Sequence, residues 1–143
     1  MPLIRGKKRK IAAVVAGAAA LPVLFAPSAW ANWSSYIYGA TIGFESRRWA
    51  DESYTEVNFK GCKSEVNLAV GIEIYQDINN WPDDGYGEKQ FTNCFIGKTS
   101  TGTESGLPSG AYYFEIKSID GSYQPSANWV TATSVSVDTT LAD

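Results

Sequence analysis

The chain has 143 residues, with 12 basic and 15 acidic side chains and no histidine. Without an imidazole, the Ser-His-Asp and Cys-His arrangements of nucleophilic enzymes cannot form. The acidic balance also argues against binding to nucleic acid, because phosphates need a basic surface.

Residues 1–31 have the pattern of a secretory signal peptide. A basic cluster at residues 5–10 precedes an apolar run at residues 11–25, and the segment ends in Ala29-Trp30-Ala31, with small residues where a signal peptidase cleaves. The alternative is a membrane anchor, but the apolar run is about 15 residues long, and a span needs roughly 20. We therefore predict a secreted, extracellular protein with no membrane partner after leader cleavage.

Removal of the leader leaves a single predicted domain, residues 32–143, with 7 basic and 15 acidic side chains and a net charge of −8. A domain of this length has a modest core. Its two cysteines, Cys62 and Cys94, are predicted to form a disulfide, because the protein is exported and lacks histidines for a zinc site. In the chain-entropy model this loop of about 33 residues contributes on the order of 3–4 kcal/mol.

Alternating apolar and polar residues predict strands along the mature chain. The expected strands are residues 36–44, 54–59, 66–74, 88–95, 111–119 and 129–138. The run 66–74 has the clearest alternation, and we interpret the stretch between the cysteines as a central strand and its return partner. Residues 77–87 and 97–110 are rich in turn formers and are expected to be loops.

No helical periodicity follows residue 31, so the predicted fold is all-β. We expect a single-domain antiparallel β-sandwich, with a small β-barrel as the alternative. The run Leu107-Pro108-Ser109-Gly110-Ala111-Tyr112-Tyr113-Phe114 resembles the Gly-x-Tyr entry to a late strand in immunoglobulin-like and fibronectin-like sandwiches. This resemblance favours the sandwich.

Aromatic residues outside the predicted core are the main candidates for a binding site, because Trp and Tyr bury a large area at low entropic cost. Arg47, Arg48 and Trp49 are predicted to form a compact anchor cluster. The alternative is a tryptophan lid over the end of the sandwich with an arginine stacked on it. The other predicted partner-binding residues are Trp33, Tyr36, Trp81 and Tyr86.

Carboxylates suggest two weaker hypotheses. Asp51/Glu52 and Asp83/Asp84 are adjacent pairs, whereas glycoside hydrolysis needs two carboxyl groups facing each other across a cleft, so no catalytic residue is predicted. Calcium is the second hypothesis, since Asp83, Asp84 and Glu88 lie near Asp77 and Asn79. Their spacing matches no EF-hand loop, and a solvated acidic loop is the preferred interpretation. We expect no metal and no cofactor.

Residues 32–44 are aromatic, contain glycine and lack proline. A segment of this kind can pair with the sheet edge of a partner or lie in a partner's groove. The alternative is that it forms the first strand of the domain itself.

The leader, the single disulfide and the pattern Phe44-x-Ser46-Arg47-x-Trp49-x-Asp51, followed by Val57-x-Phe59-x-Gly61-Cys62, resemble small secreted proteins of streptomycetes and their relatives. Among these, the chain is similar in size and type to the small adaptor subunits of umbrella-shaped antibacterial toxin particles. The resemblance covers about a third of the mature chain. It implies a non-enzymatic bridge between a helical-repeat toxin subunit and a lectin-bearing subunit.

Two functional hypotheses follow. The first is a secreted, non-catalytic adaptor or structural subunit whose aromatic residues bind other secreted proteins. The second is a stand-alone ligand-binding module, either a carbohydrate-binding module or a protease inhibitor. A carbohydrate module would hold Trp81 and Tyr86 coplanar on one face, and an inhibitor would present residues 97–110 as a rigid exposed loop.

Overall fold

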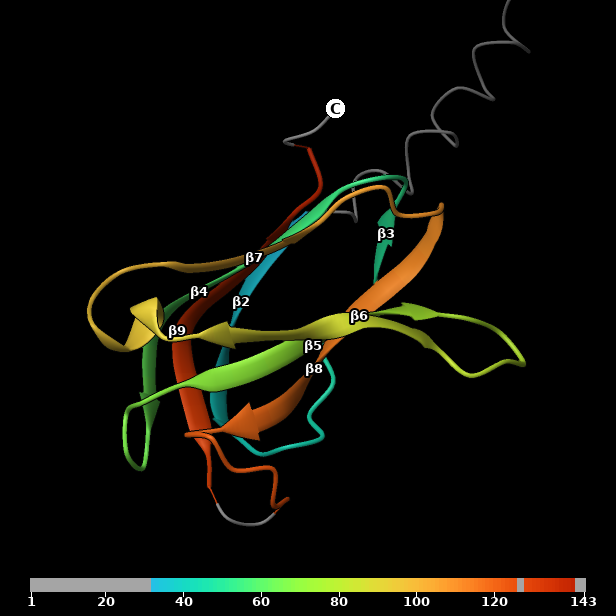
Figure 1. Cartoon of the computed structure of the whole chain (residues 1–143). Coiled ribbons are helices and arrows are strands. Elements are labelled where there is room, and N and C mark those ends of the chain that lie inside the picture. Colours follow the sequence, from blue (N-terminus) through green and yellow to red (C-terminus); the bar gives the residue numbers. More distant parts are fainter. Residues whose placement is uncertain (1–31, 126–127, 141–143) are drawn as a thin grey trace, which may run out of the picture. The chain divides into compact units, whose positions relative to one another are not determined.

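A computed structural model describes residues 32–125 and 128–140, so the predicted signal peptide lies outside the described residues. The described chain forms strands connected by loops and one short 3-10 helix (Figure 1). In chain order these are β2 (Trp33–Ala40), β3 (Trp49–Asp51), β4 (Thr55–Ser64), β5 (Val70–Asp77), β6 (Asp84–Phe91), η1 (Asn93–Phe95), β7 (Ser100–Glu104), β8 (Gly110–Ile119) and β9 (Val130–Asp138). Over these described ranges, the protein has no helix with the length and apolarity needed to cross a bilayer.

The strands form two antiparallel sheets of four strands each, in the orders β2-β9-β4-β7 and β3-β8-β5-β6. Side chains from both sheets meet in one core, where the ring of Phe59 on β4 lies 5.1 Å from Phe91 on β6 and 5.5 Å from Phe114 on β8. Both sheets have free edges and do not close on themselves. The predicted β-sandwich is therefore confirmed, and the alternative of a small barrel is not formed.

Part of β4 and part of β8 bury the side chains that the period-two pattern predicts. Thr55, Val57 and Phe59 of β4 are fully buried on one face, as predicted, and Tyr112, Phe114 and Ile116 of β8 are buried in the same way. The Tyr112 hydroxyl donates a hydrogen bond to the carbonyl of Pro108. This contact has the form of the tyrosine corner of immunoglobulin-like sandwiches, and it gives a physical role to the Gly-x-Tyr sequence.

The inward face of the first sheet changes at Gly61. Upstream of this residue Phe59 is buried, whereas downstream Cys62 is buried, so strict alternation is broken. Gly61 has φ +61°, and a Cβ at this position would lie 2.0 Å from Thr133 Oγ1 on β9. Both features favour glycine at this position. The same change of face occurs on the paired strand β9, where Ala132 and Val135 are both buried.

Cys62 and Cys94 form the predicted disulfide, with a Cα–Cα distance of 5.1 Å. Its expected position between a central strand and its return partner is wrong. Cys62 lies on β4 in the first sheet, whereas Cys94 lies in η1, which connects β6 of the second sheet to β7 of the first. The disulfide therefore ties the first sheet to a connection between the two sheets, and its sulfur atoms are buried.

Several predicted boundaries are wrong. The strand expected at 66–74 begins at Val70, the strand expected at 36–44 ends at Ala40, and Cys94 lies in η1 rather than in a strand. β3 lies between the expected strands 36–44 and 54–59, where no strand was predicted, and β7 lies in the middle of residues 97–110, which were expected to be a loop. β3 has three residues and β7 is Ser100–Glu104, so neither has enough apolar alternation to give a period-two signal.

Candidate functional site

The expected cluster of Arg47, Arg48 and Trp49 is not formed. Trp49 is 2% exposed, because pairing of β3 with β8 points its side chain into the core, and the prediction that it is a surface anchor is wrong. Its ring lies 6.2 Å from that of Trp33, and the Arg47 guanidinium lies 5.5 Å above Trp33. The arginine stacking expected in the alternative interpretation therefore occurs on Trp33, whereas Trp49 belongs to the core.

Arg48 points to a different surface. Its guanidinium lies 3.8 Å from the centre of the Tyr113 ring on the outer face of the second sheet and forms ion pairs with Glu45 (3.1 Å) and Asp77 (2.8 Å). Tyr113 in turn stacks on Tyr75, with 5.4 Å between ring centres and 13° between planes. These contacts hold Arg48 in an internal network, so it has a structural role of its own.

The acidic residues of the β5–β6 connection also have partners within the fold. Asp83 Oδ2 accepts a hydrogen bond from the Tyr113 hydroxyl (2.6 Å), and its Oδ1 accepts one from the Ile78 amide (2.9 Å). The hydrogen bond from Tyr113, together with that from Ile78, lowers the pKa of Asp83. In the part of the chain that the structure describes, no three His, Cys, Asp or Glu side chains are grouped so that they could hold a metal ion.

Trp81 and Tyr86 differ in their surroundings. Trp81 is 74% exposed in the connection between β5 and β6. Tyr86 is partly buried on β6 and packs against the core, 6.3 Å from the Tyr112 ring. Only Trp81 is an exposed ring, so Tyr86 does not extend it into the exposed two-ring platform expected of a carbohydrate module.

The exposed aromatic residues of β2 remain as the best candidate site. Tyr36 is 69% exposed and Tyr38 is 85% exposed, and neither contributes to the core. β2 pairs with β9 along one side, with register shifts after Ser35 and after Ile37. Gly39 has φ +62°, a left-handed conformation that suits glycine, and its amide donates to Thr131 Oγ1 (3.0 Å).

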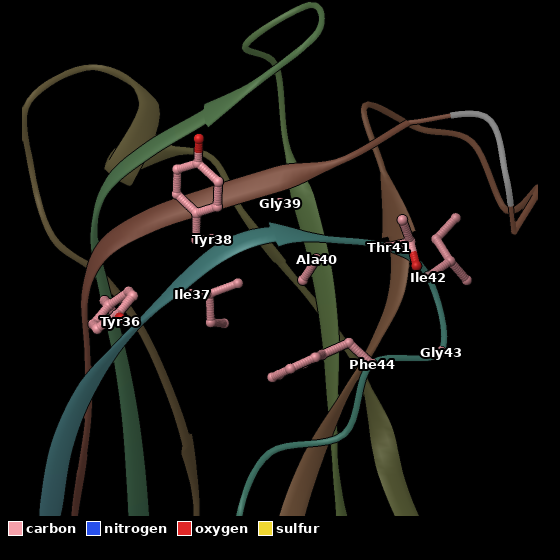
Figure 2. Close-up of a pocket in the computed structure, with 9 residues that line it drawn as sticks. All are labelled: Tyr36, Ile37, Tyr38, Gly39, Ala40, Thr41, Ile42, Gly43 and Phe44. Atoms are coloured by element: carbon pink, nitrogen blue, oxygen red, sulfur yellow. The ribbon is translucent and has the colours of Figure 1, made fainter.

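The second register shift explains how these side chains are distributed. Simple alternation predicts that Tyr36, Tyr38 and Ala40 share a face, but the extra residue turns Ala40 inward. Ile37 and Ala40 are buried, and Figure 2 shows Tyr38 on the opposite side of the strand from both. Alternation with the buried Ile37 puts the two tyrosines in solvent, and the bulge adds Ala40 to the core.

The hollow drawn in Figure 2 is lined by residues 36–44 and has a volume of about 580 Å³. It forms where the chain leaves β2 and crosses to the second sheet. There the Gly43 amide donates to the Ile116 carbonyl (2.8 Å), and the Ile116 amide donates to the Phe44 carbonyl (2.9 Å). No charged residue occurs between Asn32 and Phe44.

β2 differs from the other edge strands in its charge. β3 contains Asp51, β6 contains three charged residues, and β7 contains Glu104. Lys89 of β6 forms an ion pair with Glu104 of β7, so the two edges on that side of the sandwich are joined by charge. Charged residues on edge strands discourage pairing with other chains, and among the described edge strands β2 alone lacks them.

The described residues thus define an all-β sandwich whose exposed tyrosines lie on an uncharged edge strand. No protein-family model and no curated protein sequence matches the chain. A crystal structure of a protein from Sulfurospirillum deleyianum is similar at a TM-score of 0.40 and 11% sequence identity, covering 75% of this chain and 97% of that one. A likeness this weak assigns neither a fold family nor a function.

Proposed function

We propose that this chain is an exported, non-catalytic binding protein that uses β2 to dock another exported protein. The observation that carries the proposal is the pair of exposed tyrosines, Tyr36 and Tyr38, on an uncharged edge strand. Exposed aromatic residues with no role in the core are typical of binding anchors, and tyrosine is favoured because few rotatable bonds are immobilised on binding.

The sequence around the tyrosines supports protein recognition. Ser34, Ser35, Tyr36, Tyr38 and Gly39 are all exposed, and Tyr, Ser and Gly are enriched in antibody binding sites. The free side of β2 also offers backbone groups to a partner strand. The two register shifts limit the length of strand that a partner can add, so most of the affinity is expected to come from the tyrosine rings.

Export and the identity of the partner belong to the same proposal. The predicted leader and the disulfide support an extracellular location, where disulfides persist. The net charge of −8 after leader removal supports a partner with basic groups rather than nucleic acid or an anionic membrane. The most specific form of the proposal is the bridging adaptor of an antibacterial toxin particle, which rests on the sequence resemblance alone.

A carbohydrate-binding module is the second candidate, because exposed tyrosines beside a hollow are also suited to sugar rings. An inhibitor of proteases receives less support, since β7 occupies the segment expected to be its exposed loop.

The experiment compares three immobilised mature proteins in culture supernatant of the source organism, with mass spectrometry of the bound material. They are the wild type, a Tyr36→Ser/Tyr38→Ser variant and a Thr103→Ala control on the exposed edge of β7. The identified partner is then purified and titrated against each. We expect the double variant to bind about 30-fold more weakly or worse, with the control unchanged. Equal binding by all three proteins contradicts the proposal, and tyrosine-dependent binding on a glycan array in place of a protein supports the second candidate.

A further inference from the structure

A second set of exposed apolar side chains lies at one end of the sandwich. Val66 is 67% exposed and Leu68 is 57% exposed, both in the connection between β4 and β5. Trp129, 40% exposed, directly precedes β9. Figure 1 places the β4–β5 and β8–β9 connections at the same end of the molecule, and pairing of Ser64 with Val130 brings their bases together.

The backbone of the β4–β5 connection is hydrogen-bonded in an unusual way. All six consecutive amides from Ser64 to Ala69 donate to side-chain oxygens of the protein. The Ser64 amide donates to Asn67 Oδ1 (3.0 Å), and the Asn67 amide returns a bond to Ser64 Oγ (2.9 Å). The Glu65 amide donates to Asn128 Oδ1 (3.2 Å).

Asp120 accepts the remaining three amides. Its Oδ2 accepts from Val66 (3.0 Å), and its Oδ1 accepts from Leu68 (2.9 Å) and Ala69 (3.2 Å). The same carboxylate also accepts from Ser64 Oγ (2.8 Å) and Asn128 Nδ2 (2.6 Å). Burial alone raises the pKa of Asp120, but hydrogen bonds from Leu68, Ser64, Val66 and Ala69 outweigh it and hold the pKa below its ordinary 3.8.

These hydrogen bonds allow the β4–β5 connection to be buried against a partner without leaving its amides unsatisfied. A loop exposed to solvent does not need its own acceptors, because water satisfies its amides. A loop buried against a partner does need them, since each unsatisfied amide there carries a desolvation penalty. Here every amide is satisfied internally, and Val66 and Leu68 project outward from a connection that Asp120 holds in one conformation.

We infer that Val66, Leu68 and Trp129 form a second docking surface, separate in sequence from β2, for a protein that offers an apolar pocket bordered by one basic and one acidic group. The charges select this occupant. Glu65 and Lys63 are exposed beside the apolar side chains and form no ion pair among the described residues, so insertion into hydrocarbon would carry two charges with it. A basic group facing Glu65 and an acidic group facing Lys63 complement these two charges.

The first test concerns the free mature protein. Amide exchange measured by NMR is expected to be slow at Val66, Leu68 and Ala69 in the wild type. It should be at least tenfold faster in an Asp120→Asn variant, because an amide side chain replaces one acceptor oxygen with a donor. Asparagine tolerates the φ of +51° at this position, so the variant keeps the backbone conformation. Unprotected amides in the wild type would overturn the inference.

The second test identifies the occupant. A photo-crosslinking residue replaces Leu68 in one protein and Thr103 in a control protein. Both proteins are mixed with culture supernatant and irradiated, and any protein that is captured at position 68 but not at position 103 is purified. Capture by itself does not count as support. The expected result is that Val66→Ser/Leu68→Ser weakens binding of the purified partner by about 10- to 100-fold, while Tyr36→Ser/Tyr38→Ser leaves it unchanged.

The other outcomes contradict this inference without bearing on β2. They are the absence of a captured protein at position 68, crosslinking of the chain to itself, and equal affinity of the Val66→Ser/Leu68→Ser variant. A further contradiction is binding to phosphatidylcholine vesicles that raises and blue-shifts tryptophan fluorescence in the wild type but not in that variant. Such binding would assign this surface to a membrane.

Discussion

Replacing both cysteines by alanine, Cys62→Ala/Cys94→Ala, is expected to lower the free energy of unfolding by about 3–4 kcal/mol. The estimate comes from the loop-closure entropy of a disulfide with a sequence separation of 32 residues. Because both sulfur atoms are buried, alanine substitution adds a smaller cost from lost packing. The reduced wild type lacks the cross-link but keeps the sulfur atoms. Comparing it with the double variant therefore separates the loss of the cross-link from the loss of packing.

The assay is urea unfolding of residues 32–143 followed by tryptophan fluorescence. With a slope near 1.5 kcal/mol per molar urea, the unfolding midpoint should fall by about 2 M on reduction and slightly further in the double variant. Amide exchange should speed up around η1, because the disulfide joins this connection to β4. A midpoint that is unchanged by reduction, in protein shown to be fully reduced, would refute the assigned stabilising role of the disulfide.

Three further predictions concern single side chains. Trp49→Ala should lower the free energy of unfolding by about 3–5 kcal/mol, because Trp49 is buried. Arg48→Ala should lower it by about 1 kcal/mol or less, because the ion pairs of Arg48 are partly exposed. Similar shifts in the urea midpoint of the two variants would contradict these assigned roles. Burial raises the pKa of Asp51, so this carboxyl binds its proton more tightly in the folded state and its effect on stability becomes more favourable as pH falls. Asp51→Asn should therefore be neutral or stabilising at pH 7, and a loss of more than about 2 kcal/mol in urea unfolding would show that the negative charge is needed. The pKa of Asp120 is lowered in the folded state, so its contribution to stability is present above pH 3.8 and is lost as pH falls through the folded pKa. The wild type should therefore lose more stability between pH 5 and pH 2.5 than the Asp120→Asn variant. Equal losses in the two proteins would contradict this prediction.

The predictable parts of the fold were those controlled by local pattern. Residues 54–59 alternate over a regular backbone, and the structure buries their predicted face. In the strand expected at 111–119, Tyr112, Phe114 and Ile116 are buried as predicted, and the pairing with β5 then shifts by one residue between Ile116 and Ser118. The disulfide followed from the number of cysteines, but its position did not. Sequence spacing does not reveal that Cys94 leaves its strand and enters a connection between the two sheets.

The remaining differences arise where one residue interrupts the period. Gly61 changes the buried face of β4 because of its positive φ and its close approach to Thr133. Gly39 accompanies the bulge that turns Ala40 inward and leaves Tyr38 in solvent. A glycine within a strand suggests such an irregularity, but the amino-acid sequence does not show which side chains change face.

The candidate site was predicted in part. Tyr36 and Trp81 are exposed as a binding residue requires, whereas Trp49 is buried by its pairing with β8. The sequence does not reveal the burial of Trp49, because the three residues of β3 are too few to show alternation. Val66 and Leu68 were predicted to lie in a strand but lie in a loop. Their apolar alternation continues that of β5, whereas their amides bond to Asp120, more than 50 residues away in the sequence.

Hydrogen exchange of the mature protein, alone and in complex with the partner that the wild type captures, tests the proposed role of β2 most directly. We predict that binding slows exchange across Trp33–Ala40, the range of β2, and leaves the opposite edge strand, β7, unchanged. Unchanged exchange along β2 in a stable complex would contradict the account.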